Sequence, residues 1–290
     1  MKVGIFSIIE TDQVYGCILK LKIALDELNV EYVVLDNLKG KKIFSQNTAS
    51  FSSFEDLKSQ IDLLITVGGD GTILKTVDYI RDSGIPIVGI NMGRLGFLAS
   101  IKQEEISHRI RQIIKGDYNV LDRILLSTSF DKSHRCANVA LNEVYIYGEN
   151  NTSIINTVVS VNDIYLNSYW SDGLIVATPT GSTGYSLSCG GAIIMPDTNN
   201  FIITPVAPHN LNLRPIIVSG DDVIKVNVVR STSKCYMSLD SRIKVDIDKE
   251  EIIIKKSDFS VKTLIFKDQS FSSALHEKLF WGIDVRSSRT

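Results

Sequence analysis

Asp70 lies in a glycine-rich turn, Gly-Gly-Asp-Gly-Thr at 68–72, whose composition indicates a binding or catalytic role for its carboxylate. An apolar stretch at 63–67 precedes this turn and a helix-like stretch at 73–77 follows it. The start of a helix offers unpaired N–H groups and the positive end of the helix dipole, which suit a phosphate. A carboxylate does not suit a phosphate, so its presence favours contact with a hydroxyl group or a metal ion. The turn therefore predicts phosphoryl chemistry.

A glycine-flanked aspartate is also common in tight hairpin turns, and the turn alone leaves that interpretation open. A helical pattern follows here, however, where a hairpin would need a second strand. We expect this helix to begin near Ile73, with the hydroxyl of Thr72 as its N-cap. The glycine spacing matches neither a Walker A loop nor a G-x-G-x-x-G motif, so neither of those nucleotide sites is predicted.

Two other segments have compositions that fit a nucleotide. The turn at 91–98 is either a glycine-permitted loop or a second wall of the same crevice, with Phe97 as an apolar surface for a base or ribose. The segment 178–191 is rich in glycine and hydroxyl side chains, as an exposed linker can be, but Pro179 and its apolar flanks indicate a fixed path. Fixed hydroxyls and free backbone amides are what a ribose and a pyrophosphate require.

Polar residues inside an apolar stretch mark a further candidate, the pair Asn142-Glu143. Either both side chains are exposed at a strand edge, or they are buried and need partners or a ligand. Asp172 alone is typical of an ordinary turn residue. The four histidines and four cysteines show no metal-ligand spacing, and no Ser–His or Cys–His nucleophile is indicated.

Alternating strand-like and helix-like stretches in the N-terminal part must position these turns. The predicted strands are 3–9, 32–35, 63–67 and 86–90, and the predicted helices are 14–28, 73–80 and 106–114. The polar stretch 38–60 between them is expected to be partly mobile. This alternation predicts an α/β domain with a Rossmann-like parallel sheet, which binds ligands at the carboxyl ends of its strands.

Beyond Asp122 the pattern changes to short β-type stretches separated by turn residues. The predicted strands are 124–130, 138–147, 157–166, 173–178, 201–205, 223–229, 235–239, 243–247, 251–255 and 261–266. They indicate an all-β, sandwich-like second domain. A helical tail at 271–282, with Leu275, Leu279 and Phe280 on one side, is expected to return to the first domain. The expected domains are therefore 1–122 with 268–290, and 123–267.

Composition limits the class of protein. A length of 290 residues allows one large domain or two ordinary ones. The formal net charge of −2 gives no reason to expect nucleic acid or an anionic membrane as a partner. The chain contains no run of about 18 apolar residues, and its first apolar stretch is too short for a secretory signal. We therefore expect a cytoplasmic protein.

Taken together, these motifs resemble the NAD kinase family. The resemblance rests on 68–72, 93–98, 142–143, 171–173, 178–191 and 208–215, with a similar tail around Trp281-Gly282. The glycine turn alone also occurs in diacylglycerol-type lipid kinases and phosphofructokinases, whereas the whole combination is specific. The departures are Trp170, where some members carry a basic residue, and Gly184, where many carry alanine. Both concern substrate preference and regulation.

The resemblance implies an α/β nucleotide-binding domain joined to a β-rich NAD-binding domain, with the active site in the cleft between them. It implies transfer of the γ-phosphoryl group of ATP to the 2′-hydroxyl of the adenosine ribose of NAD, which gives NADP. A divalent metal ion, magnesium or manganese, would assist the transfer. Members are generally homodimers or homotetramers, so the same is expected here.

The resemblance also assigns roles to residues. Asp70 would be the catalytic base or the group that orients the hydroxyl, and Lys75 would approach a phosphate. Asn142 and Glu143 would contact the nucleoside moieties of NAD. The other nucleotide-binding residues that it implies are Gly68, Gly69, Gly71, Thr72, Phe97, Asp172, Thr183, Gly184, Tyr185, Ser186, Leu187, Ser188, Ala207 and Arg242.

Two rival functions stay open at this point. A lipid or sugar kinase could share the glycine turn, but it would leave Asn142-Glu143 and the 183–188 segment unexplained. A non-catalytic nucleotide sensor could use the same scaffold, although a sensor has little need of a carboxylate that faces a phosphate. An assay for NADP separates the first rival from an NAD kinase.

Overall fold

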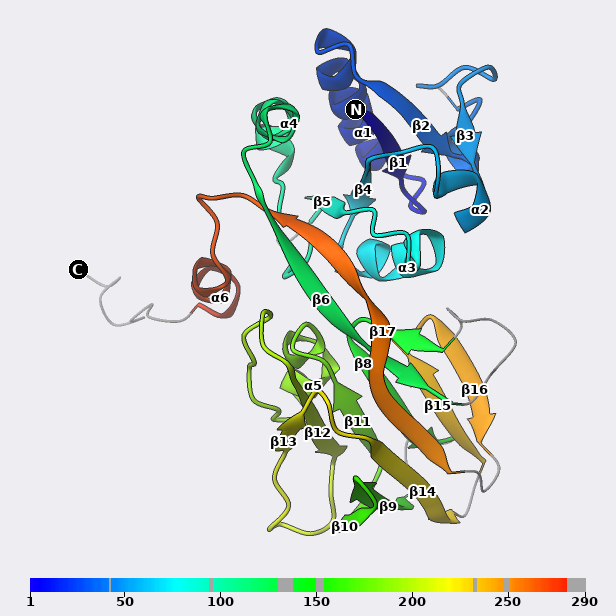
Figure 1. The fold of residues 1–290 in the computed structure, drawn as a ribbon, viewed down its shortest axis with the longest axis vertical. Coiled ribbons are helices and arrows are strands. Elements are labelled where there is room, and N and C mark those ends of the chain that lie inside the picture. Colours follow the sequence, from blue (N-terminus) through cyan, green and yellow to red (C-terminus); the bar gives the residue numbers. More distant parts are fainter. Residues whose placement is uncertain are drawn as a thin grey trace, which may run out of the picture. The chain divides into compact units, whose positions relative to one another are not determined.

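The computed structural model describes residues 1–41, 43–93, 96–129, 138–149, 154–231, 234–247 and 251–280. The chain forms two compact units, Met1–Leu121 with Lys262–Thr290, and Asp122–Val261. The boundary between them falls within two long strands, β6 (Asn119–Thr128) and β17 (Ile252–Ile265), drawn in green and orange in Figure 1. The first unit is therefore built from both ends of the chain.

The first unit contains the parallel sheet that the alternating pattern predicted. Its strands lie in the order β3-β2-β1-β4-β5, and they are β1 (Lys2–Phe6), β2 (Glu31–Leu35), β3 (Ser50–Phe51), β4 (Leu63–Gly68) and β5 (Ile87–Asn91). The end of β17 adds to β5 through pairing of Thr263 with Ile87. The chain order reverses between β1 and β4, and doubly wound sheets bind ligands at the carboxyl ends of strands at such a reversal.

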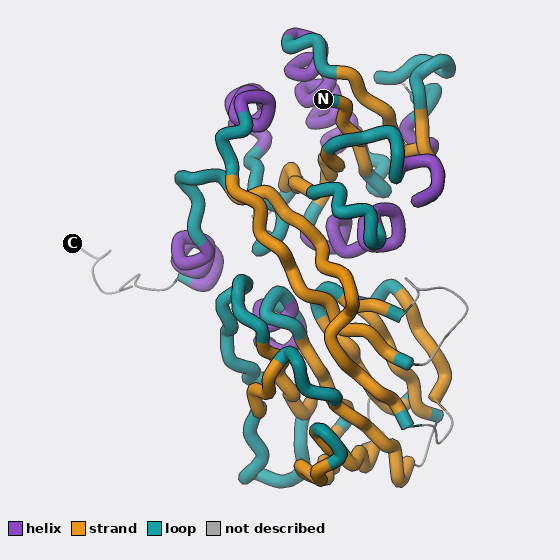
Figure 2. Tube along the Cα trace, viewed as in Figure 1, coloured by secondary structure: helices purple, strands orange, loops and turns teal. Residues whose placement is uncertain are grey.

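Helices α1 (Asp12–Glu27), α2 (Phe54–Leu57) and α3 (Asp70–Ile80), with the 3₁₀ turn η1 (Asp36–Leu38), connect these strands (Figure 2). The 3₁₀ turn η2 (Gln103–Glu105) and helix α4 (Ile106–Lys115) lead from β5 to β6. In α1, the Thr11 hydroxyl caps the N-terminus by accepting the N–H of Val14 at 3.3 Å. Helix α4 ends at Gly116, whose φ of 72° suits glycine. No helix in the described part of the chain is long and apolar enough to cross a membrane.

The polar stretch 38–60 has more regular structure than we expected, because it contains β3 and α2. Ser53 caps α2 by accepting the N–H of Asp56, and the Asp56 carboxylate accepts the N–H of Ser53 in return. This capping box satisfies two backbone donors at the start of the helix. Phe51 and Leu57 are fully buried and anchor the segment to the core.

The predicted start of α3 is wrong by three residues. The helix begins at Asp70 with Gly69 as its N-cap, so Thr72 is buried inside the first turn and does not cap the helix. Gly68 makes room for this arrangement, since a Cβ there would lie 2.1 Å from the Thr72 Oγ1 atom. The hydroxyl of Thr72 therefore packs against the end of β4.

The second unit is a β-sandwich, as the short strand-like stretches predicted. One sheet has six antiparallel strands in the order β13-β12-β11-β8-β15-β16, and they are β8 (Glu143–Gly148), β11 (Gly173–Ala177), β12 (Asn200–Val206), β13 (Ile216–Ser219), β15 (Cys235–Leu239) and β16 (Ile243–Ile247). The other sheet contains β9 (Ile155–Val161), β10 (Ile164–Ser171), β14 (Ile224–Ser231) and β17, and β6 also pairs with β7 (Val139–Ala140).

A continuous apolar core lies between these two sheets. Its buried members include Val144, Ile146, Leu174, Phe201 and Met237 from the six-stranded sheet, and Val159, Ile224 and Ile254 from the other sheet. Successive side chains of a strand point to opposite faces. Because Val144 and Ile146 face the core, Glu143, Tyr145 and Tyr147 of the same strand face away from it.

Some strand boundaries differ from the prediction. The stretch 157–166 was expected to be one strand, but β9 and β10 form a hairpin whose turn residues Asn162 and Asp163 have φ of 50° and 64°. Two consecutive residues with positive φ are typical of a type I′ turn. The expected strand 138–147 is interrupted at Leu141-Asn142, between β7 and β8. We did not predict β13, whereas 251–255 and 261–266 belong to the single strand β17.

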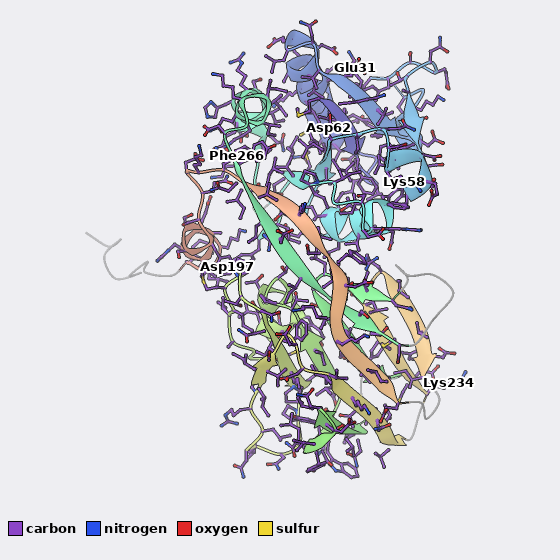
Figure 3. The ribbon with its side chains drawn as sticks, in the orientation of Figure 1. Glu31, Lys58, Asp62, Asp197, Lys234 and Phe266 are labelled. Carbon is purple, nitrogen blue, oxygen red and sulfur yellow. The ribbon has the colours of Figure 1, made fainter. Side chains whose placement is uncertain are left out.

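The C-terminal segment returns to the first unit, as expected, and contains α6 (Phe271–Leu279). The guanidinium of Arg109 lies 4.5 Å from the ring centroid of Phe266, which is labelled in Figure 3. The same guanidinium donates to Asp268 at 2.7 Å. Lys102 forms an ion pair with Glu277 of α6 at 2.8 Å.

The prediction that Phe280 belongs to the apolar side of this helix is wrong. Leu275 is buried, but Phe280 lies beyond the helix with φ of 55° and is 69% exposed. A residue in the left-handed conformation ends a helix, so Phe280 cannot continue the apolar side. Trp281 and Gly282 lie outside the described residues.

Candidate active site

Asp70 follows β4 after one residue, Gly69, at the chain reversal of the parallel sheet, and its carboxylate meets the second glycine turn. The Oδ2 atom accepts the N–H of Phe97 at 2.6 Å, and Oδ1 accepts the N–H groups of Leu98 and Ala99 at 3.1 and 3.0 Å. Hydrogen bonds from N–H groups to a carboxylate are stronger than those between neutral groups. The structure thus brings the two sequence-predicted turns together, although Arg94 and Leu95 lie outside the described residues.

Gly96 permits this close approach. A Cβ at this position would lie 1.8 Å from Oδ1 of Asp70 and 2.3 Å from its Cγ atom. Any side chain would therefore displace the carboxylate. Our sequence reasoning missed this role because the partner of Gly96 lies far away in the sequence.

The ring of Phe97 contacts the C-terminal helix. Its centroid lies 5.9 Å from that of Phe271, and the ammonium of Lys278 lies 3.9 Å from the Phe97 ring centroid. A cation over an aromatic face is attracted by the ring quadrupole. The loop that donates to Asp70 is therefore supported by α6 from the side of Phe97.

The backbone on either side of Asp70 is open to an approaching molecule. A Cβ at Gly69 or at Gly71 would meet no atom of the described residues within 4 Å. Both lie at the start of α3, where the helix dipole favours an anion. Lys75 is exposed on the same helix and supplies a positive charge near this end.

The second unit contains a cavity of about 490 Å³. Three of the predicted binding residues line it, Glu143, Asp172 and Tyr185, and so do Tyr145, Tyr147, Asp240 and Ser241, which we did not predict. Its volume is within the range of small-molecule sites. The alternation along β8 could have identified the two tyrosines, because they share a face with Glu143.

Aromatic rings form one wall of this cavity. Tyr145 and Tyr147 are stacked at 4.6 Å between centroids with 12° between their planes, and Tyr185 meets Tyr145 edge-on at 5.2 Å. Burial is the main cause that raises the pKa of Tyr145, and the nearby Tyr185 raises it further. The Tyr145 hydroxyl therefore stays protonated at neutral pH. The wall combines flat apolar faces with hydrogen-bonding groups.

Two buried acceptor atoms have no partner among the described residues, Oε2 of Glu143, which lines the cavity, and Oδ1 of the adjacent Asn142. Burial, together with the negative charge of Asp240, raises the pKa of Glu143 to about 7. The backbone N–H of Tyr185 bonds to Glu143 and opposes this shift. Buried polar atoms are nearly always hydrogen-bonded, so these two indicate a ligand or water.

Internal hydrogen bonds fix the path of the segment 178–191, so the linker interpretation is wrong. It contains the turn η3 (Gly181–Thr183) and the helix α5 (Tyr185–Ser188). Ser182 accepts the N–H of Ile194 at 3.0 Å, and the buried hydroxyl of Ser186 lies 2.8 Å from that of Thr204. Several hydroxyls that we expected to face a ribose or pyrophosphate therefore bond within the protein.

The other predicted binding residues of the second unit lie outside the lining of this cavity. The hydroxyl of Thr183 donates to the carbonyl of Thr180 at 3.2 Å, Leu187 is half-buried and Ser188 is exposed. Ala207 is exposed, with φ of 44°. The buried guanidinium of Arg242 donates to the carbonyl of Val139 at 2.7 Å and lies 3.4 Å from Asp240.

Two glycines of the 178–191 segment should differ sharply in their tolerance of alanine. A Cβ at Gly181 would lie 2.1 Å from the backbone oxygen of Asn142, which cannot move without distorting β8. At Gly184 the nearest atom would be Oε2 of Glu143, at 3.0 Å. We expect Gly181→Ala to destabilise the protein by about 2 kcal/mol or more, and Gly184→Ala by less than about 1 kcal/mol.

Urea unfolding of the two variants and the wild type measures this difference. Gly184→Ala is the matched control, since it adds the same methyl group three positions further along the chain. Equal stabilities for the two variants would contradict the close packing of Gly181 against Asn142.

The described residues contain no group of three or more His, Cys, Asp or Glu side chains that could hold a metal ion. The Asp70 carboxylate already accepts three N–H groups. Mg²⁺ in nucleotide sites usually keeps several waters and binds the substrate phosphates with one or two protein carboxylates. The residues present therefore fit an ion that arrives with a nucleotide better than a resident metal centre.

Comparison with protein families gives matches in both units. Residues 26–118 match the ATP-NAD kinase N-terminal domain, and residues 141–265 match the ATP-NAD kinase C-terminal domain. The NAD kinase of Christiangramia forsetii is 41% identical over 99% of this chain and 100% of its own length. That of Porphyromonas gingivalis strain W83 is 39% identical over 93% of this chain and 92% of its own length.

Two solved structures have the same fold. An NAD kinase from Archaeoglobus fulgidus in complex with ATP has a TM-score of 0.79 and 27% identity, over 96% of this chain and 98% of its own. Yeast NADH kinase complexed with NADH has a TM-score of 0.83 and 22% identity, over 98% of this chain and 89% of its own. With both family domains matched and a relative above 40% identity over its full length, this chain belongs to the ATP-NAD kinase family.

Proposed function

We propose that this protein transfers the γ-phosphoryl group of ATP to the 2′-hydroxyl of the adenosine ribose of NAD. Membership of the ATP-NAD kinase family supports a phosphotransferase that uses ATP and NAD. The observation that carries the proposal is the partnerless buried acceptor of Glu143 in a cavity walled by tyrosines, next to a second such acceptor on the adjacent Asn142. A lipid or sugar kinase is not favoured, because both halves of the chain match ATP-NAD kinase domains.

Asp70 is the residue that we assign to the reacting hydroxyl. Its Oδ2 atom accepts a single N–H, from Phe97, and so keeps a lone pair for a further donor. A ribose hydroxyl is a very weak acid, and phosphoryl transfer needs positioning more than a strong nucleophile. In this role Asp70 orients the 2′-hydroxyl and accepts its proton as the new bond forms.

The N-terminus of α3 is the region that we assign to the phosphate groups. The open backbone at Gly69 and Gly71 and the charge of Lys75 favour anions there. Gly68 and Thr72 shape the turn from within, since the Thr72 side chain packs against Gly68. A divalent ion, magnesium or manganese, would arrive with ATP and neutralise phosphate charge.

The cavity of the second unit is the site that we assign to NAD. The faces of Tyr145 and Tyr185 suit a planar base. Glu143 and the adjacent Asn142 supply acceptors for ribose hydroxyls, and Asp172 lines the cavity with Glu143. We assign a supporting role to the 183–188 segment, whose Ser186 is bonded to Thr204.

Incubation of the purified protein with ATP, NAD and Mg²⁺, followed by an enzymatic assay for NADP, tests the proposed function. We expect NADP to form, and heat-denatured protein serves as the control. Binding of NAD without any product, with Mg²⁺ or Mn²⁺ and with ATP or polyphosphate as donor, would instead favour a nucleotide sensor. Phosphorylation of a lipid or sugar in place of NAD would overturn the proposal.

We also propose that the protein is a homodimer or homotetramer. The edge strand β10 exposes Ile164 and Tyr165, at 73% and 62% of their surface, and Trp170 at 45%. Unpaired edge strands with apolar side chains tend to associate with another chain. Light scattering coupled to size-exclusion chromatography measures the mass in solution, and a monomer of 32.2 kDa would contradict this proposal.

A further inference from the structure

Asp240 lies in the turn between β15 and β16, yet it is buried and bonds to a distant part of the chain. Its Oδ2 atom accepts the N–H of Leu141 at 2.7 Å. Its Oδ1 atom accepts the N–H groups of Asn142 and Glu143 at 2.7 and 3.0 Å. The carboxylate therefore holds three consecutive backbone amides at the interruption between β7 and β8.

These three amides belong to the segment that carries the two partnerless acceptors. A further backbone bond, from the N–H of Asp240 to the carbonyl of Glu143 at 3.0 Å, ties the turn to the first residue of β8. The turn at Asp240 therefore fixes the backbone that carries the Asn142 and Glu143 side chains. An asparagine would be a poor substitute there, because its amide NH₂ group would face an N–H donor.

Asp240 also places a negative charge beside Glu143. Both carboxyl groups line the same cavity, and burial is the largest cause that raises the pKa of each. Arg242 and the three N–H groups favour the ionised form of Asp240, whereas the N–H of Tyr185 is the single backbone donor to Glu143 among the described residues. Since two close carboxylates cannot readily both ionise, these hydrogen bonds favour Glu143 as the protonated member of the pair.

We propose that Asp240 is a positioning residue for the NAD site, which acts through the backbone that it holds and through the charge that it places beside Glu143. A protonated Glu143 can donate one hydrogen bond and accept others, so it can pair with ribose hydroxyls in either sense. An ionised Glu143 can only accept, and it adds charge to a cavity that must take an anionic dinucleotide. The inference rests on the proposed function, since it assigns NAD to this cavity.

Other titratable groups near Glu143 must be considered in any pH experiment. Those that face it or line the same cavity are Asp172, Tyr145, Tyr147, Tyr185, Cys189 and Asp240, with Arg242 behind Asp240. Burial raises the pKa of the Tyr145 hydroxyl and of the Cys189 thiol, so both stay neutral near pH 7. Glu143 is therefore the group whose titration the experiment follows.

The test measures the KM for NAD between pH 5.5 and 8.5 for the wild type and for Asp240→Asn. We expect the KM of the wild type to rise as pH increases through about 7, where Glu143 ionises. In Asp240→Asn the rise should move to lower pH by about one unit or more, because the neighbouring charge is gone. Glu143→Gln should remove the pH-dependent step altogether.

Asp163→Asn is the matched control, because it removes a carboxylate from another two-residue turn of the same unit. Asp163 is exposed and has φ of 64°, a conformation that asparagine tolerates well. Its KM profile should match that of the wild type. A uniform rise in KM for Asp240→Asn without a shift of the midpoint would reduce Asp240 to a structural residue and overturn the proposal.

A second measurement keeps the proposal testable if Asp240→Asn does not fold. Infrared difference spectra of the wild type and Glu143→Gln at pH 6.5 should show a protonated carboxyl stretch that only the wild type has. Its absence would overturn the proposal. The two hypotheses fail separately: a wild type that makes no NADP contradicts the proposed function, whereas an active wild type without the midpoint shift or the carboxyl signal contradicts only the role of Asp240.

Discussion

Asp70→Asn is expected to lower turnover by about 10²–10⁴-fold and to leave the KM for NAD within a few fold of the wild type. The substitution removes the group that we assign to the ribose hydroxyl. It also places an amide NH₂ against either the N–H of Phe97 or those of Leu98 and Ala99, which the two carboxylate oxygens accept in the wild type. Steady-state kinetics of NADP formation at saturating ATP measure the effect.

The variant Gly96→Ala keeps the Asp70 carboxylate but displaces it, so it tests whether the position of this group matters. The new methyl group would require Asp70 to move, because its Cβ would lie 1.8 Å from Oδ1. We therefore expect a large loss of turnover although the carboxylate remains. Asp26→Asn is the control, since it removes a carboxylate that pairs with Lys22 on α1, a different helix from the one that carries Asp70. An Asp70→Asn variant with more than about a tenth of wild-type turnover would exclude Asp70 from the proposed role.

Glu143→Gln is expected to change how stability depends on pH. The pKa of Glu143 is raised from 4.5 to about 7 in the folded protein, so the folded state binds its proton more tightly than the unfolded state does. The stability that this proton contributes is complete below about pH 4.5 and is lost as pH rises through about 7. Glutamine stays neutral throughout and does not lose it.

The stability of Glu143→Gln relative to the wild type should therefore increase by about 3 kcal/mol between pH 4 and pH 8. Urea unfolding at several pH values measures this difference. Asp163→Asn is again a suitable control, because its exposed carboxylate should produce no comparable trend. A difference that stays constant with pH would mean that Glu143 titrates in its ordinary range.

The helices, strands and glycine turn could be predicted from the sequence because each is indicated by residues that are close together in the chain. The alternation of apolar stretches in the first 120 or so residues indicated the parallel sheet, and short stretches beyond Asp122 indicated the sandwich. The glycine turn with Asp70 combines a strand end, a helix start and a carboxylate within a few residues. These features need no knowledge of distant partners.

The contacts that shape the candidate site involve distant partners, and the sequence does not show them. Asp240 lies in a two-residue turn with φ of 51°, where aspartate is an ordinary turn residue. Only the folded sheet reveals that it bonds to amides about a hundred positions earlier in the chain. The hydroxyl of Ser186 could not be assigned either, because its partner Thr204 comes from the neighbouring β12.

The division of the chain has a consequence for biosynthesis. The first unit needs Lys262 and later residues, and its strand β5 pairs with β17 through Ile87 and Thr263. During translation, a nascent chain that has emerged only as far as the sandwich still has β5 at the open side of an unfinished sheet. Completion of the unit that carries Asp70 must therefore wait until Lys262 and the residues after it have left the ribosome.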